Sequence, residues 1–275
     1  MSKREIRFNL DHVLEILRKG IRRADVFMGI GINAAAHEPP ISHILAREGL
    51  NDIHLVKAEL SDEEKAHVAE EFGKWVRTNG MRELIETFSI FLHRVYVPMF
   101  VLRRGCGRNG EKLSLPPQFE RMGVTDQVDE FAKMVPVNEG DHRILKSLNQ
   151  ARNCFAHRQG GVGERDVDTK TEVFCLYWTA FQLEIVEPNG NIVPEEAMIG
   201  RVFENGGVFQ ARVVQREKVF SLNDELVLEK RELKEICFSV LTLGQRFLQG
   251  AISAASDAGV LENKVDTNLN DPKPV

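Results

Sequence analysis

Four polar residues near the middle of the chain carry side chains suited to chemistry on a phosphate. Arg152, Asn153, His157 and Arg158 lie within residues 151–160, which read ARNCFAHRQG. An imidazole titrates near neutral pH and can therefore move a proton. A guanidinium can hold a phosphate through two parallel hydrogen bonds. Together these groups suffice for cleaving RNA without a metal ion.

Helical spacing places these residues on different faces of one helix. At about 100° per residue, an apolar stripe forms within roughly 40° of Ile144, and it consists of Leu148, Ala151 and Phe155. Asn153 at about 180° and His157 at about 220° point away from that stripe, and Arg152 lies on its flank at about 80°. Asn153 and His157 are four residues apart, so they are close enough to act together.

His157 therefore does not have the position of a core histidine. It lies at the expected C-terminal end of the helix, where the helix dipole favours the protonated imidazole and a nearby arginine disfavours it. His142, Lys146 and Asn149 extend the outward face into a continuous polar strip. A solvated helix end without a chemical role is the alternative interpretation of the same residues.

Further helices are expected around this one. Apolar residues at helical spacing predict helices over about residues 9–28, 61–102, 125–135, 141–158 and 229–255. The first can be capped by Asn9 or Asp11 and the fourth by Asp141. Ser61 and Glu64 have the spacing of a capping box, which starts the second helix.

Glycine and proline predict where these helices end or bend. Gly29, Gly31 and the prolines at 39 and 40 predict an irregular segment over 29–60, in which 53–58 can form a short extended piece. Asn79-Gly80 can end or kink the second helix, and Pro98 can bend it. Residues 103–117 have the composition of a basic loop, for which a solvated role is preferred over RNA guidance. Gly160-Gly161 stops the fourth helix.

The segment 172–228 differs from the rest of the chain. Residues 173–178 and 181–186 are rich in β-branched and aromatic side chains, so we expect strands there. Residues 198–203 and 208–214 flank Asn205-Gly206-Gly207, which predicts a hairpin. The aromatic residues Tyr177, Trp178 and Phe181 are expected to pack rather than to stack on bases. The fold class is therefore mainly α, with a helical core and a small antiparallel β insert before the last helix.

Composition limits the class of protein. The chain has 275 residues, 43% of them hydrophobic and 28% charged, with a net charge of -5. This balance argues against a broad basic surface, although a local basic cleft is compatible with it. Four scattered cysteines favour neither a zinc site nor a disulfide framework, and they fit a reducing cytoplasm. The charged N-terminus lacks the apolar core of a signal peptide.

Other candidate sites are weaker. The apolar stretch 85–102 is interrupted by Glu86, His93 and Arg94, so it is interpreted as a buried helix and not as a membrane span. Glu86 and His93 either line a cleft or are satisfied polar groups of the core. Histidines at 37, 43 and 54 do not have the spacing of a metal motif, and no metal or other cofactor is expected.

The stretch from Arg152 to His157, followed by Arg158 and a glycine turn, resembles the Arg-polar-x-x-x-His signature of the HEPN superfamily of α-helical domains. The order of long helices, motif helix and final helix is also similar, over about residues 61–255. The β insert and the segment 29–60 depart from that pattern. The apolar face of the last helix needs the helical core to bury against, so one HEPN-like domain over 1–255 with an insert at 172–228 is preferred over two independent domains. Residues 256–275 are expected to form a flexible tail.

The resemblance also implies an activity. Members are metal-independent endoribonucleases, often toxins or antiviral effectors, that dimerise so that two motifs share a cleft. His157 would be the general acid or base, Arg152 would bind the scissile phosphate and Asn153 would orient either group. Arg158 is a further phosphate contact, expected from its charge and position.

A homodimer also has a physical reason. Cleavage needs a second group to protonate the leaving oxygen, and a two-fold axis beside His157 would supply the partner's copy. RNA is the expected substrate, an antitoxin or regulatory protein is a further expected partner, and no membrane is expected. The competing interpretation is a non-catalytic, dimeric HEPN-like binding or scaffold protein.

Overall fold

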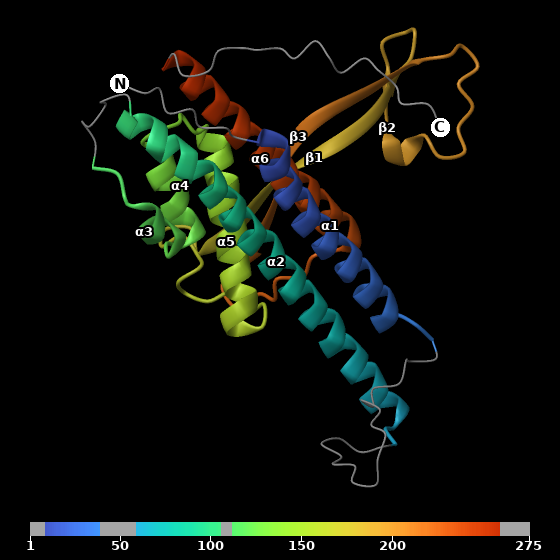
Figure 1. The fold of residues 1–275 in the computed structure, drawn as a ribbon. Helices are drawn as coiled ribbons and strands as arrows, with labels where there is room; N and C mark the ends of the chain where they lie inside the picture. Colours follow the sequence, from blue (N-terminus) through green and yellow to red (C-terminus); the bar gives the residue numbers. More distant parts are fainter. Residues whose placement is uncertain (1–8, 39–58, 106–111, 259–275) are drawn as a thin grey trace, which may run out of the picture.

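The computed structural model describes residues 9–38, 59–105 and 112–258. This part of the chain is mainly helical, with a three-stranded antiparallel sheet before the last helix, as the sequence predicts (Figure 1). Its elements in chain order are α1 Leu10–Ala35, α2 Asp62–Gly105, α3 Pro116–Glu120, α4 Val124–Ala132, α5 Glu139–Arg158, β1 Val173–Val186, β2 Ile192–Pro194, a 3₁₀ turn Glu195–Ala197, β3 Val208–Ser221 and α6 Lys230–Asp257.

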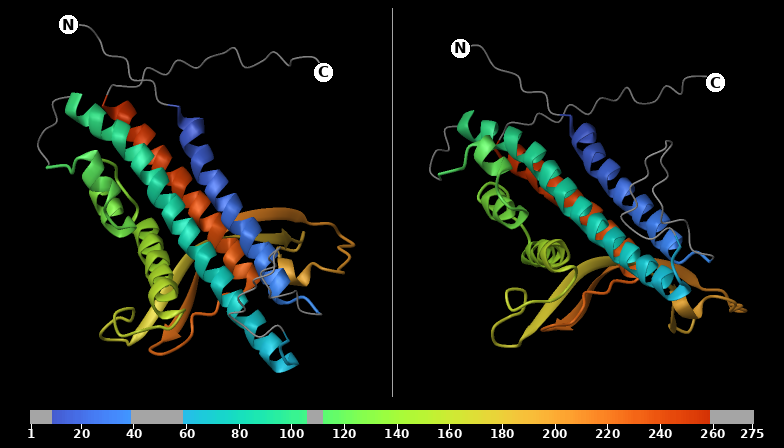
Figure 2. Two further views of the ribbon diagram at one scale, coloured as in Figure 1. Left: turned by 60° about the horizontal axis from the view of Figure 1, so that its bottom comes forward. Right: turned by 90° about the horizontal axis from the view of Figure 1, so that it is seen from below.

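Three long helices, α1, α2 and α6, run side by side, and α3, α4 and α5 lie on the other side of α2 (Figure 2). Glycines bring the long helices close together. A Cβ atom at Gly20 of α1 would lie 2.8 Å from the Cβ of Thr87 in α2, and one at Gly31 would lie 2.8 Å from Cγ1 of Val76. Gly80 of α2 meets Met28 in the same way. These glycines thus permit packing that a larger residue would prevent.

Close packing of the long helices explains why two helices are longer than the sequence predicts. Gly29 and Gly31 were expected to end the first helix, but α1 continues through both to Ala35. Asn79-Gly80 does not end the second helix, because α2 continues to Gly105, also through Pro98. Burial against a neighbouring helix outweighs the roughly 1 kcal/mol that a glycine costs in a helix interior. The piece expected at 53–58 lies outside the described residues.

Helix starts follow the predicted capping in two of three cases. Asn9 caps α1 by accepting a hydrogen bond from the backbone of His12 at 2.9 Å. Ser61 and Glu64 form the predicted capping box, with distances of 2.8 and 3.2 Å. Helix α5 is capped by Asn138 and not by Asp141, which lies in its first turn and accepts from Arg246 at 2.6 Å. Ion pairing with α6 explains why Asp141 is buried.

The β insert has a different topology from the predicted one. Residues 173–186 form one continuous strand, β1, which pairs over its whole length with β3, from Val173 opposite Ser221 to Val186 opposite Val208. The hairpin expected between 198–203 and 208–214 is absent, since 198–203 form no strand. The strand order is β2-β1-β3. Pairing of β3 with the long β1 offers more ladder hydrogen bonds than a short local hairpin would.

The sheet joins the helical core along one edge. Side chains of β1 and β3, among them Phe174, Leu176 and Phe220, belong to the same buried apolar cluster as the helices. Ser147 of α5 accepts from the backbone N–H of Tyr177 at 3.0 Å, and Ser239 of α6 accepts from that of Thr179 at 3.0 Å. These hydroxyls satisfy outward N–H groups on the edge of β1 that β2 does not reach. Trp178 is buried, whereas Phe181 is half exposed against Phe238.

Helix α2 is the one described helix that is long and apolar enough to cross a membrane. Within its apolar window 56% of the residues are buried inside the protein. Phe88, Phe91 and Leu92 are fully buried there. Core helices of soluble proteins have the same length and composition, so this finding does not indicate a membrane span.

The tight contact at Gly20 makes a testable prediction. We expect Gly20→Ala to lower the free energy of unfolding by about 1–3 kcal/mol, because the new methyl group overlaps Thr87. Gly29→Ala is the matched control in the same helix, where nothing lies within 4 Å of the new Cβ. It should stabilise the protein by up to about 1 kcal/mol, the helix-propensity gain. Urea unfolding measures both. Equal effects would contradict the packing argument.

Candidate active site

The end of α5 is shaped by a left-handed turn. Gln159 has a φ of 53° and Gly160 a φ of 95°. The backbone N–H of Gly160 donates to the carbonyl of Cys154 at 3.1 Å, which closes the last turn. The positive φ at position 160 favours glycine. This turn ends the helix at Arg158, so Arg152, Asn153 and His157 lie on the last two turns of α5.

The inner face of α5 is buried as predicted. Ile144, Leu148, Ala151 and Phe155 are all buried, and so is Cys154 beside them. Burial raises the pKa of the Cys154 thiol to about 11. The thiol is therefore neutral at physiological pH and is not a nucleophile. This leaves the polar residues of the outer face to carry any chemistry.

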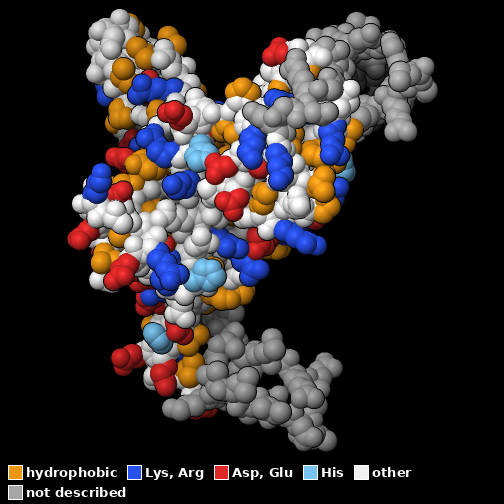
Figure 3. All heavy atoms as spheres, turned by 90° about the vertical axis from the view of Figure 1, so that its left-hand side faces the viewer, with side chains coloured by type: hydrophobic (Ala, Val, Ile, Leu, Met, Phe, Trp, Pro, Cys, Tyr) orange, Lys and Arg blue, Asp and Glu red, His pale blue; other side chains and the backbone are white. Residues whose placement is uncertain are grey.

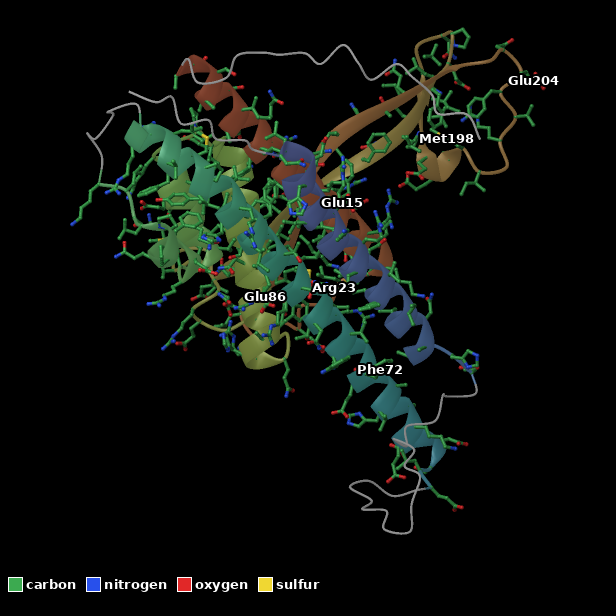
Figure 4. All side chains as sticks on the ribbon, viewed as in Figure 1. Glu15, Arg23, Phe72, Glu86, Met198 and Glu204 are labelled. Atoms are coloured by element: carbon green, nitrogen blue, oxygen red, sulfur yellow. The ribbon has the colours of Figure 1, made fainter. Side chains whose placement is uncertain are left out.

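Arg152 reaches from α5 toward α2. Its Nη2 lies 3.8 Å from Oε1 of Glu86, and its Nη1 donates to the side-chain carbonyl of Asn153 at 3.0 Å. Glu86 also accepts from Nε of Arg82, one turn earlier in α2, at 2.6 Å. Figure 4 shows Glu86 on the side of α2 that is next to α5. Glu86 is thus a residue of the candidate site, one of the two interpretations that the sequence left open.

One donor of Arg152 is unsatisfied. Its Nε–H is shielded from solvent and has no acceptor among the residues that the structure describes. The side chain as a whole keeps 27% of its surface exposed. A buried donor without a partner costs roughly 1–3 kcal/mol. The guanidinium would therefore gain from a further acceptor.

His157 is exposed at the end of the helix. Among the described residues, none forms a hydrogen bond or ion pair with its ring. Because it follows Arg152 by five residues, the two side chains diverge by about 140° around the helix axis. Asn153 lies between them and is half-buried. The arrangement is therefore an open surface centred on Asn153, with a guanidinium on one side and an imidazole on the other.

Arg158 has a partner that the sequence analysis did not anticipate. Its Nη2 lies 2.6 Å from Oδ1 of Asp166, and its Nε donates to the carbonyl of Gly161 at 3.2 Å. Asp166 is buried and also accepts from the backbone of Gly163 at 2.8 Å. This pair ties the loop after α5 to the helix. The geometry thus favours a positioning role for Arg158 over the expected phosphate contact.

The predicted polar strip is only partly open. His142 pairs with Asp129 of α4 at 2.7 Å, and Asn149 contacts Thr125 of α4 at 3.3 Å. Helix α4 therefore covers the first half of the strip and leaves Asn153 and His157 accessible. Figure 3 shows the side of the molecule on which α4 and α5 lie, where basic side chains occur beside histidines and are interspersed with acidic ones.

The remaining candidates have structural partners. His93 is half-buried and stacks on Phe119 with ring centroids 6.2 Å apart. Arg103 donates to the carbonyl of Met134 at 3.2 Å, and Arg104 lies over the Phe100 ring. Within 9–38, 59–105 and 112–258, no group of three histidine, cysteine or carboxylate side chains could hold a metal ion.

Comparison with known proteins finds no relative of this chain. No family model matches the chain, and neither a curated protein nor a solved structure matches it significantly. The interpretation of the site therefore depends on its own residues and geometry.

The Arg158–Asp166 pair makes a prediction about stability. We expect Asp166→Ala to lower the free energy of unfolding by roughly 1–3 kcal/mol, because it leaves a part-buried guanidinium and the N–H of Gly163 without their acceptor. Lys65→Ala is the control, because its pair with Asp62 is exposed, and it should change stability by less than about 0.5 kcal/mol. Thermal unfolding measures both variants. Similar changes in the unfolding temperature would mean that Asp166 does not stabilise the loop after α5.

Proposed function

We propose that this protein is a metal-independent endoribonuclease of the HEPN type, acting at a composite site in a homodimer. The observation that carries the proposal is the open end of α5, where exposed His157 lies one helical turn from an Asn153–Arg152 pair. His157 is thus accessible to solvent, and Asn153 lies on the helix surface between it and the guanidinium of Arg152.

The reaction follows from RNA chemistry and these residues. His157 removes the proton from a 2′-hydroxyl, whose oxygen attacks the adjacent phosphorus. The bond from phosphorus to the 5′-oxygen breaks, and that oxygen takes a proton from a second group. The products are a 2′,3′-cyclic phosphate and a free 5′-hydroxyl. Arg152 stabilises the charge that develops on the phosphate oxygens through the exposed part of its guanidinium, since its side chain keeps 27% of its surface open to solvent.

The second proton-transfer group would be the partner's His157. Both imidazoles then have complementary protonation states, one taking a proton and the other supplying it. No further acid is required within one chain. Asn153 holds Arg152 beside the site through its hydrogen bond at 3.0 Å.

The competing proposal is a non-catalytic HEPN-like dimer that acts as a binding or scaffold protein. The specific observation in its favour is Glu86, a carboxylate that lies 3.8 Å from the guanidinium of Arg152 and offsets its charge. In the catalytic proposal, phosphate must displace that carboxylate. A toxin or antiviral effector of the cytoplasm, held in check by an antitoxin or regulator, is the biological role that the catalytic proposal favours.

Activity decides between the two proposals. Purified protein should cleave single-stranded RNA in the presence of EDTA, and His157→Ala should lower the rate by at least about 100-fold, the contribution of a general acid or base. His67→Ala is the matched control, because it removes another exposed helical histidine, one that lies in α2 and pairs with Glu71. Cleavage products are resolved on denaturing gels.

A substrate control accompanies this experiment. An oligonucleotide with a 2′-deoxy group at the cleaved position should be inert, because it lacks the attacking hydroxyl. Undiminished activity of His157→Ala, or cleavage at the deoxy position, would exclude the mechanism. Absence of any cleavage by the unmodified dimer would favour the scaffold proposal.

Arg152 has a distinct expected signature. Removing its charge with Arg152→Ala should lower kcat by about 100- to 1000-fold, because a donor to the transition-state oxyanion is lost. Glu86→Gln should lower KM for RNA, because the competing carboxylate charge is removed while the side-chain shape is kept. Steady-state kinetics separates the two effects. A rise in KM for Glu86→Gln would show that the carboxylate assists binding instead of competing with phosphate.

A further inference from the structure

A second feature of the molecule is an apolar surface on α1 and α2. Five large apolar side chains are exposed there, and we call this surface the α1/α2 face: Phe27 and Ile30 on α1, and Phe72, Trp75 and Ile90 on α2. Phe27 is 63% and Trp75 62% exposed. The rings of Phe72 and Trp75 stack with centroids 6.2 Å apart. Clustered exposure of this kind marks an interaction surface.

The face contains a groove of about 330 Å³ between the two helices. Its polar lining is electrically balanced. Arg23 pairs with Glu83 across the helices at 2.9 Å, and Arg82 pairs with Glu86 within α2 at 2.6 Å. Phe27, Trp75 and Asn79 complete the groove. A neutral, partly apolar surface suits protein better than the polyanionic backbone of a nucleic acid.

We infer that a second copy of this chain docks on the α1/α2 face, about a two-fold axis that lies between the two copies of α2, at the level of Arg82 and Glu83. An isologous contact pairs each residue of α2 with the one equally far on the other side of the axis. Trp75 then meets the partner's Ile90, and Arg82 meets the partner's Glu83. Asn79 meets the partner's Glu86. In these three pairs an apolar group faces an apolar group, or a donor faces a carboxylate.

The residues involved share one side of α2. From Phe72 to Ile90 they fall within about 100° of the helix surface, as an antiparallel helix pair requires. The stripe is about 27 Å long at 1.5 Å per residue. A specific interface needs about 1,000 Å² in total, or roughly 500 Å² per copy, and the exposed side chains of α1 widen the stripe toward that area.

This surface is continuous with the candidate site. Glu86 lines the groove and lies 3.8 Å from Arg152. Helix α5 runs opposite to α2, so its C-terminal end is directed toward the part of α2 that precedes Glu86 (Figure 2). An axis at residues 82 and 83 would therefore bring the two copies of the α5 end to neighbouring positions. The inference rests on the proposed function. It names the α1/α2 face, and not the polar strip of α5, as the dimer contact that brings the two halves of the composite site together.

Sedimentation of the full chain tests the surface. The unmodified protein should have twice the monomer mass at micromolar concentration, and Trp75→Glu should be monomeric with an unchanged circular dichroism spectrum, because the side chain is exposed. Phe27→Glu, on the facing helix, should give the same result. Ile199→Glu in the β insert is the control, since that side chain is 88% exposed away from this face, and it should stay dimeric. A monomeric unmodified protein, or a dimer that survives both face variants, overturns the inference.

Crosslinking locates the axis. Arg82→Cys, treated with a short bismaleimide, should give a covalent dimer in high yield, because the axis brings residue 82 close to its own copy. Val101→Cys lies 19 residues further along the same helix, about 28 Å away, and should give only the background of the unmodified chain. Equal yields from both positions would exclude the proposed axis.

The outcomes separate the interface from the activity. Loss of both dimerisation and RNA cleavage in Trp75→Glu supports the composite site. Loss of dimerisation with full cleavage overturns the link between this surface and the site. If the unmodified protein forms a dimer that Trp75→Glu disrupts, but cleaves no RNA, the proposed interface is supported and the proposed function is refuted. Direct binding of RNA by a monomer, abolished in Trp75→Glu, would assign the face to RNA and overturn the dimer.

Discussion

Burial of the inner face of α5 is the constraint on which the candidate site depends. Leu148 and Ala151 are fully buried and Phe155 nearly so, which fixes the rotation of the helix about its own axis. Once that rotation is set, Arg152 must lie toward α2 and His157 toward solvent, because their angular positions follow from helical geometry. Burying the three side chains contributes several kcal/mol, of order 2 each for the larger two. No ion pair on the outer face could oppose that preference.

Two arginines of the same ten-residue stretch, Arg152 and Arg158, have different surroundings as a result. Arg158 reaches a buried carboxylate, Asp166, and binds the loop that follows α5. Arg152 reaches a half-exposed carboxylate, Glu86, at a longer distance, and it keeps an unsatisfied donor. The short contact with a buried carboxylate makes the first guanidinium structural. The weaker and more accessible pairing leaves the second available for exchange with an anion.

Helix α2 links the site to the rest of the molecule. One side of it is packed against α1 through glycine contacts at positions 20, 31 and 80. Its outer side carries the exposed aromatic residues Phe72 and Trp75 and, on the same stripe, Glu86, which lies 3.8 Å from Arg152 of α5. A change in the packing of α1 would therefore move both the apolar surface and the carboxylate beside Arg152. The β insert is attached separately, through Ser147 and Ser239.

The sequence by itself determined the local features of this protein. The mainly helical class, the capping box at Ser61, the end of α5 after Arg158 and its buried stripe all follow from spacing and propensity over a few residues. It did not predict that α1 continues through Gly29 or that β3 pairs with β1, because both depend on contacts between distant segments. Only the tertiary structure decided that Asp166 forms an ion pair with Arg158 and that Glu86 lies beside Arg152. The reason is physical: one helix sets which way its side chains point, whereas their partners are set by whichever element the fold packs against them.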